Sequence, residues 1–185
     1  MIDTVKKTTI DMMDKAIDAL KRNFTKIRTG RATPDLLNGI TIDYYGNPSA
    51  INAVANISIP EARQVIIQPW EKSLIQAIER AILASDLGLA PQNDGNVIRL
   101  NIPALTEERR KNLAKDAKVA GDDAKVAIRN IRRDKNEDLK KAEKAKEISE
   151  DLLKDYMDVI QKITDDYIKR IDDLVKVKSD EIMSV

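Results

Sequence analysis

Residues 153–174 read LKDYMDVIQKITDDYIKRIDDL, and this stretch decides the fold. Its apolar residues recur every three or four positions, which is the spacing of one face of an α-helix and comes close to a heptad series. Just before it, Ser149 fits a helix N-cap, with Ile148 and Leu153 in the positions of a hydrophobic staple. The apolar stripe consists of Leu153, Tyr156, Ile160, Ile163, Tyr167, Ile171 and Leu174.

A second long helix is predicted directly upstream, over residues 107–144. This stretch has no proline and a single glycine, Gly121. Thr106 is a suitable N-cap, and Glu107 and Glu108 lie in the first turn, where carboxylates favour the helix dipole. At about 1.5 Å per residue, 107–144 and 149–184 would be roughly 57 and 54 Å long. Neither helix can bury its apolar stripe alone.

The N-terminal segment supplies the missing third helix. Between residues 3 and 27 the apolar side chains are spaced by four, three, four and three positions, and Gly30 and Pro34 end the pattern. We therefore predict an elongated, antiparallel three-helix bundle built from residues 1–29 and 105–185. The stripe of this first helix consists of Met13, Ile17, Leu20, Phe24 and Ile27.

Residues 30–104 differ in composition and in apolar pattern, and they predict a small mixed β/α domain inserted into the bundle. Glycine and proline concentrate here and separate short runs that are typical of strands. The fold class is therefore α+β. Trp70, the only tryptophan, is predicted to lie in the core or to pack between the domains, and not to form a ligand platform. Strands are expected at 40–45, 53–59, 64–68 and 97–102, turns at 46–48 and 93–95, and a helix at 71–87 capped by Gly88.

The composition excludes several classes of function. The chain has no cysteine and no histidine, so it lacks thiol chemistry, the commonest general base and the commonest metal ligand. We predict no metal site, no cofactor and no enzymatic activity, and we interpret the Asp pairs at 122–123, 165–166 and 172–173 as solvated helix faces. No signal peptide and no apolar run of 18 residues is present, so we expect a cytoplasmic protein without a membrane partner.

The formal net charge of +1 conceals a strong segregation of sign. Residues 1–31 carry +4, residues 32–106 carry −3, residues 107–146 carry +5 and residues 147–185 carry −5. The last two segments could pair between two chains, as in a self-associating coiled coil, or within one bundle as antiparallel neighbours. We expect the simpler arrangement, a monomer.

Six cations of the 107–144 helix lie on one arc of the helical wheel, outside the arc of apolar residues that face the bundle. Like charges three and four positions apart repel, and this arc lacks the alternating signs of an ordinary solvated helix. Arginines occupy its centre, where their planar forks suit phosphate. Between residues 118 and 140 the arc contains Lys118, Lys125, Arg129, Arg132, Arg133 and Lys140, and within that span only Asp122 interrupts it.

Nucleic acid is the partner that this arc favours most. The absence of spaced aromatics argues against base-stacking on single strands, and no zinc ligands or basic zipper are present. A stiff helix with arginines suits the backbone of folded RNA, recognised by its shape. An acidic protein, an anionic membrane and an ordinary solvated surface remain as alternatives.

Five short motifs in register give the chain a family resemblance. They are IRTGRA at 27–32, YYG at 44–46, ASDLGL at 84–89, LTEERRK at 105–111 and VAIRNIRRD at 126–134. With them the chain resembles the bacterial ribosome recycling factors over essentially its whole length. That resemblance implies a two-armed, L-like shape, with a three-helix bundle as one arm and a β/α domain as the other.

The same resemblance implies a function and a set of residues. Family members act after termination with elongation factor G and GTP to split the ribosome, have no catalysis of their own, and dock on ribosomal RNA of the large subunit at the intersubunit face. It assigns RNA binding to Arg129, Arg132 and Arg133, and in addition to Arg28, Arg31, Arg109, Arg110 and Lys111; Lys118 and Lys125 join them from the basic arc. A hinge is expected at 29–33 and 103–106, with Thr29, Gly30, Arg31, Ala32, Pro103, Ala104 and Leu105 as its residues.

Overall fold

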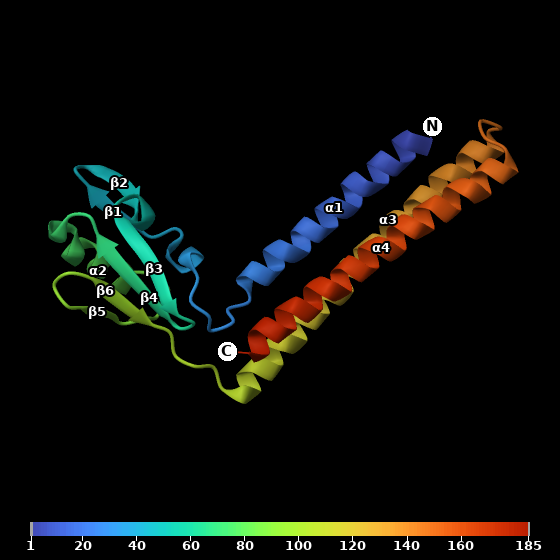
Figure 1. Ribbon diagram of the computed structural model, residues 1–185. Coiled ribbons are helices and arrows are strands. Elements are labelled where there is room, and N and C mark those ends of the chain that lie inside the picture. Colours follow the sequence, from blue (N-terminus) through green and yellow to red (C-terminus); the bar gives the residue numbers. More distant parts are fainter. Residues whose placement is uncertain (1, 185) are drawn as a thin grey trace. The chain divides into compact units, whose positions relative to one another are not determined.

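The structure is a computed structural model that describes residues 2–184 (Figure 1). The chain divides into two compact units. One unit contains the residues up to Arg28 together with Glu107–Ser184, and the other contains Thr29–Thr106. The first is helical and the second mixes strands with helix, so the predicted α+β class is confirmed.

Three long helices form the helical unit: α1 (Ile2–Lys26), α3 (Glu107–Lys144) and α4 (Glu150–Met183). α3 and α4 make an antiparallel hairpin, and α1 runs alongside in the direction of α4 (Figure 1). The predicted N-cap is present, because the Ser149 hydroxyl oxygen accepts the backbone N–H of Leu152 at 3.2 Å. The predicted three-helix bundle is therefore confirmed.

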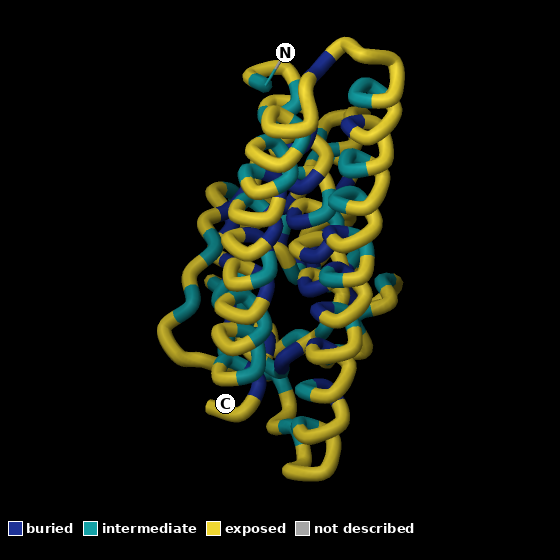
Figure 2. Tube along the Cα trace, turned by 90° about the vertical axis from the view of Figure 1, so that its right-hand side faces the viewer, coloured by how far each residue is buried: buried dark blue, intermediate teal, exposed yellow. Residues whose placement is uncertain are grey.

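The core of the bundle lies along the three facing helix sides, and the outer sides are exposed (Figure 2). On α4 the predicted stripe is turned inward: Ile160 and Ile171 are fully buried and Tyr167 is 6% exposed. At the α3–α4 turn the residues of the predicted staple, Ile148 and Leu153, belong to one apolar cluster. Burial of each such side chain contributes roughly 1.5–3 kcal/mol to folding.

Helices α3 and α4 approach closely at Gly121. A Cβ atom at this position would overlap Cγ2 of Val175 on α4. Gly121 lies inside a 38-residue helix, where glycine weakens the helix relative to alanine. The close approach therefore gives the physical reason for a glycine here.

The second unit contains two antiparallel sheets and one short helix. β1 (Thr41–Tyr44) pairs with β2 (Asn47–Ala50), and a four-stranded sheet has the order β3-β4-β6-β5. Its strands are β3 (Ala55–Glu61), β4 (Gln64–Pro69), β6 (Ile98–Asn101) and β5 (Pro91–Asn93). Helix α2 (Ile75–Leu83) buries Ile75, Ile78 and Ile82 in a core shared with both sheets. Short 3-10 turns occur at Pro34–Leu37, Ile51–Ala53 and Lys72–Leu74.

Several details of this unit differ from the prediction. β2 and β5 were not expected, because each is a short edge strand that contains proline and has no apolar alternation. The predicted turn at 46–48 was wrong in part, since Asn47 and Pro48 already belong to β2.

Two further expectations for this unit were wrong. Gly88 does not cap α2, which ends five residues earlier at Leu83. Trp70 was expected in the core or in domain packing. It is not a core residue, since it is 65% exposed, follows the last residue of β4 and donates its indole N–H to Asn56 Oδ1 at 3.3 Å.

Candidate nucleic-acid interface

The centre of the predicted basic arc lies on the outer side of α3. Ala124 and Ile128 are buried on the inner side, as the helical wheel predicts, while Arg129 and Arg133 are exposed. Within residues 2–184, neither of these two arginines has a hydrogen-bond or ion-pair partner. Being four residues apart, they are about 6 Å apart along the helix axis. Both guanidinium groups are therefore available to a ligand from solvent.

Arg132 and Lys125 have different surroundings, because both contact α4. Arg132 is partly buried and its Nη1 donates to Gln161 Oε1 at 3.1 Å, while Gln161 in turn donates to Asp165 Oδ1 at 2.8 Å. Lys125 forms an ion pair with Asp172. The basic and acidic segments thus meet inside one bundle. The helical wheel could not predict these contacts, because it places side chains on one helix and does not describe its neighbour.

The remaining predicted cations spread along α3. Lys118 is exposed, and Lys140 pairs with Glu137 at 3.5 Å. Near the start of the helix, Lys111 pairs with Glu107 at 2.8 Å and Arg110 Nη1 donates to the backbone oxygen of Met183 at 3.3 Å. Arg109, Arg110 and Lys111 are roughly 27–36 Å along the axis from Arg129, Arg132 and Arg133, at about 1.5 Å per residue. The candidate site is therefore a row of cations and not one compact cluster.

The two chain crossings are the predicted hinge segments 29–33 and 103–106. Ala32 in the first and Ile102, just before the second, are hydrogen-bonded to the same turn of the inserted unit. The Ala32 N–H donates to the Ala62 oxygen at 2.7 Å, and the Ile102 N–H donates to the Arg63 oxygen at 2.8 Å. Both acceptors lie in the turn between β3 and β4. Sequence reasoning did not find this turn, because its carbonyls act through the backbone and leave no side-chain pattern.

Gly30 packs against the second crossing. It has a φ of +75°, and a Cβ atom there would lie 3.1 Å from Leu105 Cγ. Thr29 and Ala32 are buried, at 6% and 5% exposure, whereas Arg31 is exposed. Arg28 is exposed at the end of the helical unit. The two predicted hinge segments therefore contact each other through Gly30 and Leu105.

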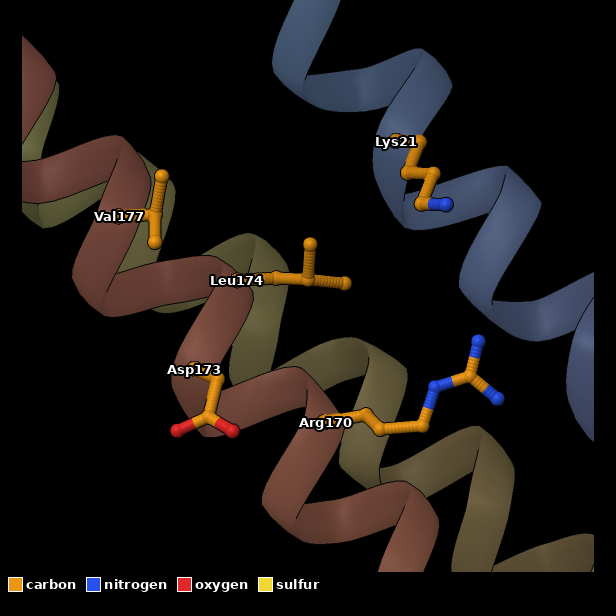
Figure 3. A pocket seen from close by; sticks show the side chains of 5 residues that line it. All are labelled: Lys21, Arg170, Asp173, Leu174 and Val177. Carbon is orange, nitrogen blue, oxygen red and sulfur yellow. The ribbon is translucent and has the colours of Figure 1, made fainter.

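A shallow hollow of about 240 Å³ lies between α1 and α4 (Figure 3). Arg170 and Leu174 extend from α4 toward α1, on which Lys21 lies, and Leu174 and Val177 are the apolar lining residues. Asp173 is the fifth lining residue. The prediction did not include this hollow, because its residues come from two helices that are 150 positions apart in sequence.

Two residues, Tyr167 and Asp14, fix the position of the Arg170 side chain at this hollow. Its guanidinium lies 4.8 Å from the centre of the Tyr167 ring and its Nη1 reaches Asp14 Oδ1 at 3.5 Å. The Tyr167 hydroxyl donates to the same Asp14 oxygen at 2.5 Å. Burial, together with this bond and the Asp14 charge, raises the pKa of Tyr167. These contacts join α1 to α4 and identify Tyr167 as a core residue, as predicted.

Residues 2–184 contain neither a cluster of metal-ligating side chains nor a membrane-spanning helix. No group of three or more acidic, histidine or cysteine side chains in residues 2–184 is placed to hold a metal ion. None of the helices in this range is long and apolar enough to span a membrane.

A family model described as ribosome recycling factor matches residues 20–183. This chain belongs to that family. A ribosome-recycling factor from Geobacillus sp. (strain WCH70) is 55% identical over 185 residues, covering all of both chains. One from Lachnoclostridium phytofermentans is 58% identical over 173 residues, covering 94% of each. The resemblance noted in the sequence is thereby confirmed.

Solved structures of ribosome recycling factors have the same fold as this chain. A solution structure of the ribosome recycling factor matches with a TM-score of 0.76 and 38% identity, covering 100% of this chain and 98% of that one. A second match has a TM-score of 0.65, 40% identity and 99% coverage of both chains. It comes from models of the T. thermophilus ribosome recycling factor and the E. coli elongation factor G bound to the E. coli post-termination complex.

Proposed function

We propose that this chain recycles ribosomes: after termination it acts with elongation factor G and GTP to separate the post-termination ribosome into subunits. Membership of the family supports this role, as does the likeness to a recycling factor that was placed with elongation factor G on a post-termination complex. The chain works as a monomer in the cytoplasm, where its substrate is assembled. It catalyses no reaction itself, and GTP is hydrolysed by the elongation factor.

The helical unit binds ribosomal RNA of the large subunit through the row of cations on α3. The observation that carries this step is the exposure of Arg129 and Arg133, which have no hydrogen-bond or ion-pair partner within residues 2–184 and lie beside an Arg132 that Gln161 orients. RNA phosphates would accept paired N–H bonds from these forks and relieve the repulsion between neighbouring charges. The full proposed set is Arg129, Arg132, Arg133, Lys125, Lys118, Arg109, Arg110, Lys111, Arg28 and Arg31.

Movement between the units is proposed for the two crossings. Because Ala32 and Ile102 are hydrogen-bonded to the β3–β4 turn, we assign the flexible part to Gly30 and Arg31 in the first crossing. In the second crossing it comprises Pro103, Ala104 and Leu105. A stiff bundle anchored on RNA, with a second unit that the elongation factor displaces, would convert that displacement into force on the ribosome.

A sedimentation assay tests the proposal. Post-termination ribosomes are incubated with the chain, elongation factor G and GTP, and free subunits are separated from intact ribosomes on a gradient. We expect free subunits only when all three components are present. Intact ribosomes under these conditions, with a known recycling factor active in parallel, would refute the proposed function.

A further inference from the structure

Tyr45, in the turn between β1 and β2, has an unusual backbone conformation for its residue type. Its φ is +49° and that of the following Gly46 is +82°. Two consecutive positive φ angles define the tight hairpin turn that asparagine or aspartate followed by glycine normally occupies, and a bulky side chain is disfavoured there. Tyr45 is nevertheless 81% exposed, so burial in the core does not compensate for this conformation.

The exposed ring is held in place by its neighbours. The hydroxyl of Tyr45 donates to Glu71 Oε2 at 3.2 Å, and the hydroxyl of Tyr44 donates to Glu71 Oε1 at 2.9 Å. The two rings meet edge to face with centroids 4.8 Å apart. One carboxylate thus fixes two aromatic side chains. Because the Tyr45 ring is already ordered, it loses less conformational entropy when a partner binds to it.

The charges near this turn indicate which kind of partner fits. Asp43, whose Oδ1 accepts the N–H of Gly46 at 2.7 Å, and Glu71 are both acidic. Neither forms an ion pair with any residue in the described part of the chain. Residues 32–106 as a whole carry seven Asp/Glu against four Lys/Arg. Phosphate would be repelled here, whereas a protein surface with basic and apolar side chains would be complementary.

We propose that Tyr45, positioned by Tyr44 and Glu71, is the anchor through which the inserted unit binds a protein with a basic, partly apolar surface. This inference rests on the proposed function, within which that protein is elongation factor G. Exposed, pre-ordered tyrosines are typical of the few residues that dominate such contacts. The strained turn is then explained, because it presents the ring outward on a rigid hairpin.

The variant Tyr45→Asn tests this anchor without endangering the fold. Asparagine suits a positive φ, so the unfolding temperature should stay the same or rise. We expect binding to isolated large subunits to be unchanged, and splitting of ribosomes with elongation factor G and GTP to slow by about tenfold, the effect of losing one such contact. The matched control Tyr45→Phe keeps the ring and loses only the hydroxyl bond, and it should stay within about twofold of the wild type.

Reversing the charge of Glu71 gives a second, independent test of the proposed anchor. Glu71→Lys should slow the splitting further and should raise the elongation factor concentration needed for half-maximal rate, while large-subunit binding stays constant. Wild-type splitting rates for both Tyr45→Asn and Glu71→Lys would overturn the anchor and leave the proposed function intact. Weaker binding to ribosomes without the factor would also overturn it, since the face would then contact the ribosome. Failure of the wild type to split ribosomes would refute the proposed function itself, and the anchor with it.

Discussion

At the scale of single residues, the arginines of α3 differ in how their side chains are held. Arg129 and Arg133 extend into solvent, and Arg132 is tied to Gln161 on the neighbouring helix. An oriented guanidinium loses less conformational entropy when it binds a phosphate than a free one does. Arg132 should therefore contribute more to RNA affinity than its partial burial suggests.

Replacing Arg132 by Glu should weaken large-subunit binding by about 1 kcal/mol or more, since a phosphate fork is lost and a repulsive charge is added. Helix content measured by circular dichroism should hardly change. The control Lys154→Gln removes an exposed cation from α4 and should leave affinity unchanged. If the Arg132→Glu variant and the wild type bound large subunits with equal affinity, Arg132 would be an ordinary surface residue and not an RNA contact.

Tyr167 predicts a specific alkaline behaviour of the helical unit. Its pKa lies above the ordinary value of 10.0 because of burial, the bond to Asp14 and the Asp14 charge. Folding thus favours the neutral phenol, so this contribution to stability is complete below about pH 10 and is lost as the pH rises through the raised pKa.

The variant Tyr167→Phe should remove this alkaline component. The free energy of unfolding, measured by denaturant titration between pH 8 and pH 11, should fall less steeply for the variant than for the wild type. All other ionisable groups are common to the two proteins, so their effects cancel in the comparison. Parallel curves would show that the phenol has no preference between the folded and unfolded states.

At the scale of elements, the close approach of α3 and α4 depends on a single glycine. Gly121 leaves room for Val175, so the helices meet near the middle of the bundle. This contact and the Lys125–Asp172 pair one turn further along α3 fix the register of the hairpin. The position of the basic face relative to α4 therefore depends on packing as well as on charge.

The variant Gly121→Ala should destabilise the bundle by about 1–3 kcal/mol through overpacking, although alanine is the better helix former. Equilibrium unfolding in urea measures the change. Adding Val175→Ala to Gly121→Ala should restore part of the loss, because it removes the methyl group that the new Cβ overlaps. A more stable Gly121→Ala single variant would mean that the helices separate without cost.

At the scale of the whole molecule, opposite charges are distributed over parts with different roles. Residues 107–146 carry +5 and residues 32–106 carry −3, so one unit suits phosphate and the other suits a basic protein surface. The net charge of the whole chain, +1, does not reveal this segregation of charge. Affinity for the large subunit should accordingly come from phosphate neutralisation by the bundle, which releases counterions.

Binding of the chain to large subunits should weaken steeply as salt rises. The double variant Arg129→Gln/Arg133→Gln should reduce the slope of log affinity against log salt by about 2, one for each lost phosphate contact. Filter binding or light scattering between 50 and 300 mM salt measures the slope. The double variant Lys154→Gln/Lys169→Gln, which removes two exposed α4 cations, should keep the wild-type slope.

The sequence by itself determined the long helices, the α+β class and the exposure of Arg129 and Arg133 on the outer side of α3. Apolar side chains repeated with the helical period over 153–174 and over residues 3–27 leave one economical way to bury them, and Ser149 marks the start of α4 through local hydrogen bonding. Five motifs in register determined the family. These properties follow from local chemistry and from periodicity, and both can be read directly from the amino-acid sequence.

Only the tertiary structure decided what depends on neighbours distant in sequence. It paired Lys125 with Asp172, oriented Arg132 with Gln161, attached both chain crossings to the β3–β4 turn and exposed Trp70 at the end of β4. Short edge strands such as β2 also escaped prediction, since their stability comes from a partner strand and not from their own residues. A helical wheel or a propensity describes one element, whereas these features arise where two elements meet.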